Sequence, residues 1–141
     1  MYGIIATWRM ALEGISKADS MLKNNESAAD SIEEAIKAVE DFEYYKSVGY
    51  GGLPNEEMEV ELDAAFMDGD TLEFGCVGGV KDFANPVSIA RSLMHYDANN
   101  FLIGQGAEKY ASRHGFERKT MLTDRCLLYT SPSPRDVEES R

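Results

Sequence analysis

A chain of 141 residues has room for one domain with a hydrophobic core. Its apolar share of 43% and its charged share of 28% are ordinary for a soluble globular protein. The formal net charge of −11 argues against nucleic-acid and membrane-surface partners, because an acidic surface repels phosphate backbones and anionic headgroups. No apolar run approaches the roughly 20 residues that span a bilayer.

The first part of the chain is predicted to form one strand and two helices. The short apolar, β-branched run at 2–8 indicates a buried strand. The next apolar residues recur at roughly helical spacing as far as Asn24 and Asn25, which can stop a helix. Ser27 can cap a second helix, whose apolar stripe consists of Ala28, Ala29, Ile32, Ala35, Ile36 and Val39. A glycine-proline loop is predicted over 47–57.

A β-hairpin is predicted next. Apolar residues alternate with glutamates over 57–62, the period of a half-buried strand. Asp68-Gly69 is a favoured two-residue hairpin turn, and the second strand is predicted over 71–77. The glutamates of this strand form an acidic stripe of Glu57, Glu59 and Glu61. The stripe could be a cation site, but a solvated strand face is favoured, because carboxylates on one face without a glycine-bounded loop lack a coordination cage.

The remaining pattern predicts two helices around a third strand. Asn85 can cap a helix over 86–96, and an apolar strand is predicted over 99–104. A last helix is predicted over 107–114, with Gly115 as its stop. The order β-α-α-β-β-α-β-α indicates a layered domain of the α+β or α/β class.

Cysteine and histidine are scarce. Cys76 and Cys126 lie far apart and suggest neither a disulfide framework nor a zinc site. With only His95 and His114 besides, a structural metal has almost no ligands, so we expect neither a metal nor a cofactor. No secretory signal is visible at the N-terminus, and the compartment is left open.

An ordered series of motifs runs from Ile4 to Arg125: "TW" at 7–8, then "VGYGGLPN", "LDAAFMDG", "GCVGGVKDFANPVSIAR", "LIGQGAEKYA" and "MLTDR". This series resembles the glycosylasparaginase (aspartylglucosaminidase) family of N-terminal-nucleophile amidohydrolases. The resemblance implies an α-β-β-α sandwich, here incomplete, and a precursor that cuts itself into α and β chains. It also implies release of aspartate from N-acetylglucosaminyl-asparagine, with relatives that act on asparagine or isoaspartyl peptides.

The nucleophile that the resemblance implies is the new N-terminal threonine of the β chain. Its own α-amino group, with a reference pKa of ~8, can accept the hydroxyl proton, but only after the preceding bond is cut. In this chain only Thr71 follows an aspartate, Asp70, and the next residues "LEFG" do not match the family's cleavage site. Thr71 is therefore interpreted as a hairpin residue. We expect no catalytic residue here, because the matched region corresponds to the α chain.

Two residues are candidates for substrate binding. Trp8 closes the first predicted strand; periodicity alone favours a core tryptophan, whereas the resemblance implies a place against the substrate. Ser47 would ordinarily be a turn residue, but it aligns with a family serine near the aspartyl group. The partners implied are a small-molecule amide, the protein's own β chain and a homodimer of αβ units.

The segment 126–141 differs in composition from the rest. Its "TSPSPRD" holds two of the four prolines and no apolar periodicity, which is typical of a disordered terminus. A second interpretation is available, since one codon choice per residue back-translates 126–136 into a sequence that resembles a transposase-type sequencing-library adapter. On that interpretation residues 1–125 are a truncated α-chain part and residues 126–141 are a non-native tail. The rival hypothesis is a standalone, non-catalytic binding or assembly module that keeps the α-chain fold.

Overall fold

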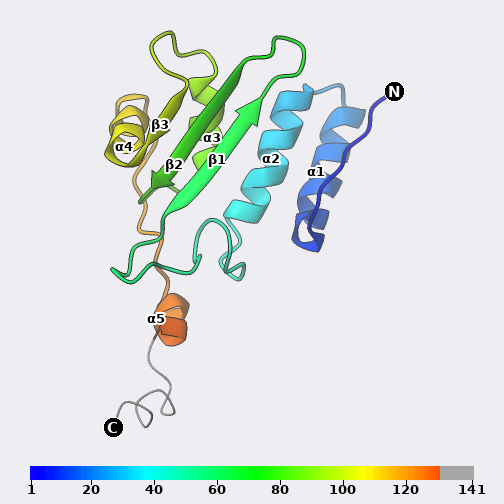
Figure 1. Cartoon of the computed structure of the whole chain (residues 1–141). Helices are drawn as coiled ribbons and strands as arrows, with labels where there is room; N and C mark the ends of the chain where they lie inside the picture. The colour runs from blue at the N-terminus through cyan, green and yellow to red at the C-terminus, as the bar shows by residue number, and fades with distance from the viewer. Residues whose placement is uncertain (131–141) are drawn as a thin grey trace, which may run out of the picture.

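The computed structural model describes residues 1–130. After a short 3₁₀ turn at Arg9–Ala11, the elements are α1 (Leu12–Lys23), α2 (Ala28–Glu40), β1 (Leu62–Met67), β2 (Phe74–Val80), α3 (Pro86–Leu93), β3 (Phe101–Ile103), α4 (Gly104–Arg113) and α5 (Asp124–Thr130). The helices α1 and α2 lie side by side beside the sheet, and α3 covers one of its faces (Figure 1). This mixed architecture confirms the predicted α+β class. Within residues 1–130, no helix has the length and apolar content that a membrane crossing requires.

The sheet has the strand order β1-β2-β3. β1 and β2 are antiparallel, and β3 runs parallel to β2, with Cys76 opposite Phe101. The register of β1 on β2 shifts between Leu62 and Ala64. At this bulge the Gly79 N–H donates to Oδ1 of Asp63 at 2.8 Å, so a side chain completes the bonding that the ladder loses.

The predicted hairpin forms, but its predicted turn is wrong. Asp68 and Gly69 do not make a two-residue loop; the connection runs over 68–73. Oδ1 of Asp68 accepts the N–H groups of Asp70 and Thr71, at 2.8 and 3.1 Å, and Leu72 takes a left-handed φ of 60°. The aspartate side chain thus builds a wider turn than the Asp-Gly pair alone predicts, and β2 begins at Phe74.

The first hairpin strand also begins later than predicted. Oδ1 of Asn55 accepts the N–H groups of Glu57 and Glu59, at 2.9 and 3.0 Å, and Met58 takes a φ of 62°. These bonds hold 55–59 as a turn, so ladder pairing starts at Leu62.

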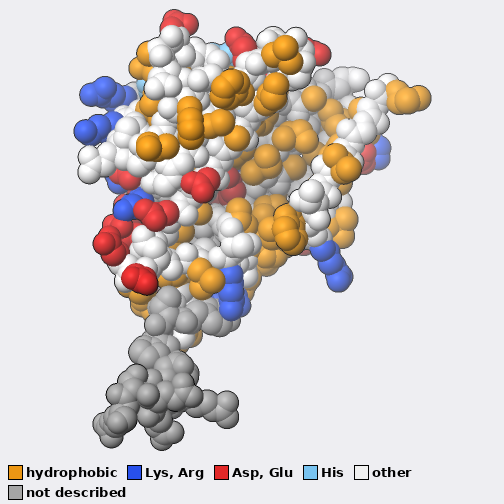
Figure 2. Space-filling view, in the orientation of Figure 1, with side chains coloured by type: hydrophobic (Ala, Val, Ile, Leu, Met, Phe, Trp, Pro, Cys, Tyr) orange, Lys and Arg blue, Asp and Glu red, His pale blue; other side chains and the backbone are white. Residues whose placement is uncertain are grey.

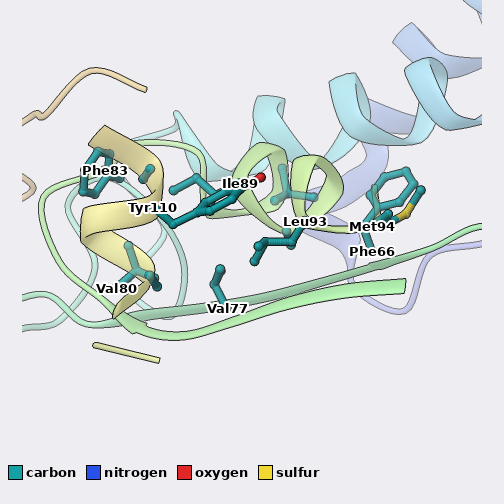
Figure 3. Close-up of a cluster of buried hydrophobic side chains, with 12 residues drawn as sticks. Phe66, Val77, Val80, Phe83, Ile89, Leu93, Met94 and Tyr110 are labelled. Carbon is teal, nitrogen blue, oxygen red and sulfur yellow. The ribbon is translucent and has the colours of Figure 1, made fainter. Parts of the chain in front are cut away.

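The main core lies between α3, α4 and the sheet. Figure 3 shows Val77 of the hairpin pointing toward α3, Phe66 beside Met94 at the end of that helix, and Val80 beneath α4; all belong to one buried cluster. The helix approaches β2 closely at a glycine: a Cβ placed at 75 would lie 1.9 Å from the carbonyl oxygen of residue 90. The packing of α3 on the sheet therefore depends on the missing side chain at that point.

The strand predicted over 2–8 is wrong for the described chain. The segment is extended but pairs with no strand among residues 1–130; it runs along the α1–α2 pair instead (Figure 1). The Tyr2 hydroxyl donates to Oδ1 of Asp19 at 2.8 Å, and Ile5 is exposed. A β-branched run becomes a strand only where a free sheet edge meets it, and here the segment contacts helices.

The segment after Arg125 begins as part of the folded body. Helix α5 crosses this position, and Cys126 is only 2% exposed, with its Sγ 3.4 Å from the carbonyl oxygen of Gly52. At Cys126 the chain therefore still contacts the loop over 47–52. Residues 131–141 lie outside the described residues, and the division at 125/126 stays a prediction.

The face of the sheet opposite α3 is apolar, and no helix or strand among residues 1–130 covers it. Hydrophobic side chains gather over the strands in Figure 2, and Phe101 and Ile103 are 57% and 68% exposed. We expect the 141-residue chain to self-associate through this face, because contiguous exposed apolar surface drives association. Light scattering after size-exclusion chromatography should find oligomers, or the expressed chain should be insoluble. A monodisperse monomer with a sharp cooperative melt would contradict this and support the standalone-module hypothesis.

Candidate functional site

The "VGYGG" loop is seated on the end of α2. The carbonyl oxygen of Glu40 accepts the Tyr50 N–H at 2.7 Å, and the Gly51 N–H donates to the Met121 carbonyl oxygen at 3.0 Å. Gly49 has a φ of +64°, and a Cβ there would lie 2.0 Å from the carbonyl oxygen of Glu40. Only glycine fits this contact, so the motif is explained by the close seating of the loop.

Trp8 closes the N-terminal segment and lies over an apolar pocket. Its carbonyl oxygen accepts the Ala11 N–H at 3.0 Å, which begins the 3₁₀ turn. The pocket has a volume of about 330 Å³, and its wall combines the N-terminal segment, α1, α2 and Val48. Trp8 is 71% exposed, so in this chain it is not a core residue.

Ser47 precedes a residue that lines this pocket, Val48. Val48 lines the cavity together with Trp8, whereas the Ser47 residue is exposed. The fold therefore brings the loop that carries Ser47 to the pocket that Trp8 borders, although the two residues are far apart in sequence. Their roles in substrate binding stay predictions.

Thr71 lies in the hairpin turn, away from this pocket. Its hydroxyl is 3.2 Å from a carboxylate oxygen of Glu73, and its N–H donates to Asp68. The backbone nitrogen of Thr71 belongs to a peptide bond, so it cannot accept the proton of the hydroxyl as a free amino group can. The arrangement fits a turn residue and offers no activated nucleophile.

The acidic stripe is partly neutralised by a lysine. Nζ of Lys81 makes a close ion pair with Glu59 and lies 3.4 Å from Glu61. Pairing with this lysine and exposure to solvent together account for the stripe. In the described part of the chain, no group of three or more His, Cys, Asp or Glu side chains could hold a metal ion.

The most perturbed acid of the described residues is Glu40, which sequence reasoning missed. It is only 3% exposed; one carboxylate oxygen accepts from Nδ2 of Asn85 and the other from the Val87 N–H, both at 3.2 Å. Burial raises the pKa of Glu40 to about 7, and the charges of Asp41 and Glu33 push it in the same direction. One signal was available: Glu40 follows Ile36 by four residues and so lies on the apolar face of α2.

The raised pKa of Glu40 should make the folded chain less stable as the pH rises. The folded-state pKa of Glu40 lies above its ordinary 4.5, so the folded chain holds this proton more tightly than the unfolded chain does. The stabilisation of the fold that comes from this tighter proton binding is complete below about pH 4.5 and is lost as the pH rises through about 7. Between about pH 5 and about pH 8 we expect roughly 2–3 kcal/mol to be lost from the free energy of unfolding. Thermal melts across this range measure it.

Glu40→Gln should flatten this dependence, because an amide keeps an acceptor for Val87 and does not titrate. Asp41→Asn is the matched control: it removes a neighbouring exposed carboxylate that also bonds Asn85, and it should leave most of the pH slope in place. Equal slopes in the wild type and Glu40→Gln would contradict the assignment.

Comparison with known proteins gives the family. A model of the Asparaginase family matches residues 5–130. The chain is 34% identical over 120 residues to the N(4)-(beta-N-acetylglucosaminyl)-L-asparaginase of Elizabethkingia miricola, covering 85% of this chain and 35% of that protein. It is 37% identical over 124 residues to a plant-type L-asparaginase of Thermococcus kodakarensis, covering 88% and 36%. It is 38% identical over 120 residues to the isoaspartyl peptidase/L-asparaginase of Rattus norvegicus, covering 80% and 36%.

The chain thus spans about a third of the length of these curated relatives. The family match runs from the N-terminal segment, through the loop on α2, to α5. It confirms the resemblance that the motifs carry, and the chain belongs to the asparaginase family of hydrolases.

Proposed function

We propose that this chain is the α-chain part of a threonine-nucleophile amidohydrolase that releases aspartate from an amide substrate. The observation that carries the proposal is the similarity, over most of the chain, to relatives named for asparaginase and isoaspartyl peptidase activities. The Trp8 pocket supports it, because it gives a small substrate an apolar wall beside the loop that holds Ser47.

The substrate class follows from what the relatives' names share. An N4-linked glycosyl asparagine, free asparagine and an isoaspartyl peptide all contain an amide on the side-chain carboxyl of aspartate. We propose this β-amide as the bond that is cleaved, with N4-(beta-N-acetylglucosaminyl)-L-asparagine as the first substrate to test. The alternative substrates are asparagine and isoaspartyl amides, which differ from it in the group attached to the amide nitrogen.

The proposed mechanism needs a second chain segment. In it, the precursor cuts itself before a threonine, and the freed amine takes the proton of that threonine's hydroxyl as the oxygen attacks the amide carbon. Donors facing the developing oxyanion stabilise the tetrahedral intermediate, and the amide nitrogen of the substrate leaves with the proton that the threonine's amino group took up, so that an ester to the threonine remains. Water then attacks this ester, with its proton passing through the amino group to the threonine oxygen, and aspartate is released. The chain described here then supplies the Trp8 side of the pocket to its own β chain, within a homodimer of αβ units. Its net charge of −11 supports a site without nucleic-acid or membrane partners.

The test is to sequence the source DNA across the codon for Arg125 and to express the frame found there. We expect the frame to continue to an Asp-Thr-Ile-Gly-like segment, and the longer protein to release aspartate from the glycosylated asparagine. Its threonine-to-alanine variant at that segment is the control and should be inactive and uncut. A natural stop codon directly after this region would contradict the proposal and support the standalone module.

A further inference from the structure

Glu40 stands where α2, α3 and the loop over 47–52 meet, and it contacts the other two elements through different groups. Its carboxyl group reaches α3, where it accepts the Val87 N–H at 3.2 Å. Its carbonyl oxygen reaches the loop, where it accepts the Tyr50 N–H at 2.7 Å. One residue therefore bonds two segments that are otherwise separate in sequence.

The bond to α3 takes the place of a helix cap. Asn85 occupies the capping position, but its side chain makes no capping bond to α3. It turns to Glu40 and Asp41 instead, at 3.2 and 3.0 Å. The carboxyl group of Glu40 therefore satisfies a free N–H at the start of α3, from another helix.

The loop over 47–52 packs tightly against the backbone of Glu40. Gly49 touches the backbone of Glu40 so closely that a Cβ would lie 2.0 Å from its carbonyl oxygen. The preceding residue, Val48, lines the pocket that Trp8 borders. A shift of Glu40 is therefore passed directly to the wall of that pocket.

We propose that Glu40 is a positioning residue: anchored on α3 by its carboxyl group, it fixes the loop over 47–52 and with it the Val48 wall of the Trp8 pocket. Its meaning for catalysis rests on the proposed function, since only a substrate pocket makes this wall part of an active site. The seating of the loop itself does not depend on any activity.

The charges around Glu40 favour its neutral form. Asp41 lies next to it, and Glu33 faces it from the same helix. Glu33 is held by Ser88 and Arg91 of α3, and Arg91 also pairs with Asp30 at 2.6 Å. The hydrogen bonds that the carboxyl group accepts from the Asn85 amide and the Val87 N–H favour its ionised form. Burial, together with the charges of Asp41 and Glu33, outweighs these bonds, so ionisation of Glu40 should destabilise its buried position against α3.

Hydrogen exchange at single-residue resolution tests this on the full 141-residue chain. Glu40→Ala should lower the protection factors of both the Val87 and the Tyr50 amides by about fivefold or more, the loss expected when a helix cap is removed. Glu40→Gln, which keeps an acceptor, should restore both to within about twofold of wild type. The Ser31 amide, at the far end of α2, is the internal reference and should change less than either.

Loss of protection at Val87 alone would overturn the inference, because Glu40 would then be a local cap only. An equal loss at Ser31 would also overturn it, because the effect would be general destabilisation. Asp41→Ala removes a neighbouring bond to Asn85 and should leave Tyr50 protected.

If Glu40→Ala does not fold, a comparison of the wild type with Glu40→Gln across a range of pH still tests the inference. From about pH 5.5 to about pH 8.5 the Tyr50 protection factor should fall further than that of the Ser31 amide in the wild type, and both should stay level in Glu40→Gln. An equal fall at Tyr50 and Ser31, or matching profiles in the wild type and the variant, would overturn the inference. Because exchange uses no substrate, an inactive completed protein would contradict the proposed function without affecting this result.

Discussion

The 141-residue chain, incubated alone, should release no aspartate from N4-(beta-N-acetylglucosaminyl)-L-asparagine or from asparagine. The only threonine that follows an aspartate is Thr71, and it lies in a turn with its N–H bonded to Asp68. A peptide nitrogen cannot take the hydroxyl proton, so hydroxyl and base are not combined on one residue. The difference from the completed protein should be all or none. An aspartate assay on both proteins measures it.

The same incubation should leave the Asp70–Thr71 bond intact. Oδ1 of Asp68 accepts the N–H groups of Asp70 and Thr71, so this peptide bond belongs to an ordinary hydrogen-bonded turn. Intact-mass spectrometry after long incubation is the measurement, with Thr71→Ala as the matched control. A new fragment beginning at Thr71 in the wild type only, together with released aspartate, would overturn the assignment of the nucleophile to another segment.

In the completed protein, replacing Trp8 with Phe should lower kcat/KM by about tenfold or more, a loss of at least ~1.4 kcal/mol in transition-state stabilisation. The indole gives the pocket a broad apolar wall and one N–H donor, and phenylalanine keeps only the first. Positioning of a small amide in attack geometry is sensitive to such a loss. Stability should change little, because Trp8 is 71% exposed in this chain.

Steady-state kinetics and thermal melts on Trp8→Phe and Trp8→Ala separate the two roles of this residue. If Trp8 were a core residue of the completed protein, the alanine variant would lose roughly 3–5 kcal/mol of stability through a cavity, and the phenylalanine variant would keep its kinetics. Unchanged kcat/KM with a collapsed melting temperature would remove Trp8 from the site. Tyr2→Phe, on the same segment but outside the wall of the pocket, is the control for general perturbation.

The helices were the most predictable part of the fold, because their signals are local. Oγ of Ser27 accepts the Asp30 N–H at 3.0 Å, which confirms the predicted cap of α2. Pro86 begins α3 as expected, and the predicted hairpin and third strand are present. The turn at 68–73 could not be read from an Asp-Gly pair, because the Asp68 side chain, rather than the glycine, sets its length.

Non-local features were not predictable from local patterns. The run at 2–8 has strand composition, but composition does not supply a partner edge. Glu40 was missed because a glutamate near a helix end usually faces solvent, and its burial depends on α3 arriving more than 40 residues later. Trp8 and Ser47 became candidates through family resemblance, and only the fold shows that Val48 joins their segments at one pocket.

The bond between Gly51 and Met121 has a consequence for the order of folding during synthesis. The α1–α2 pair and the hairpin close over short stretches of chain, so they can form while translation continues. The loop beside the pocket cannot take its final bonds until residue 121 has emerged, and the Cys126 thiol joins Gly52 later still. The pocket wall is therefore among the last parts of this chain to mature, and an early ribosome pause should leave it open while the helical pair is already built.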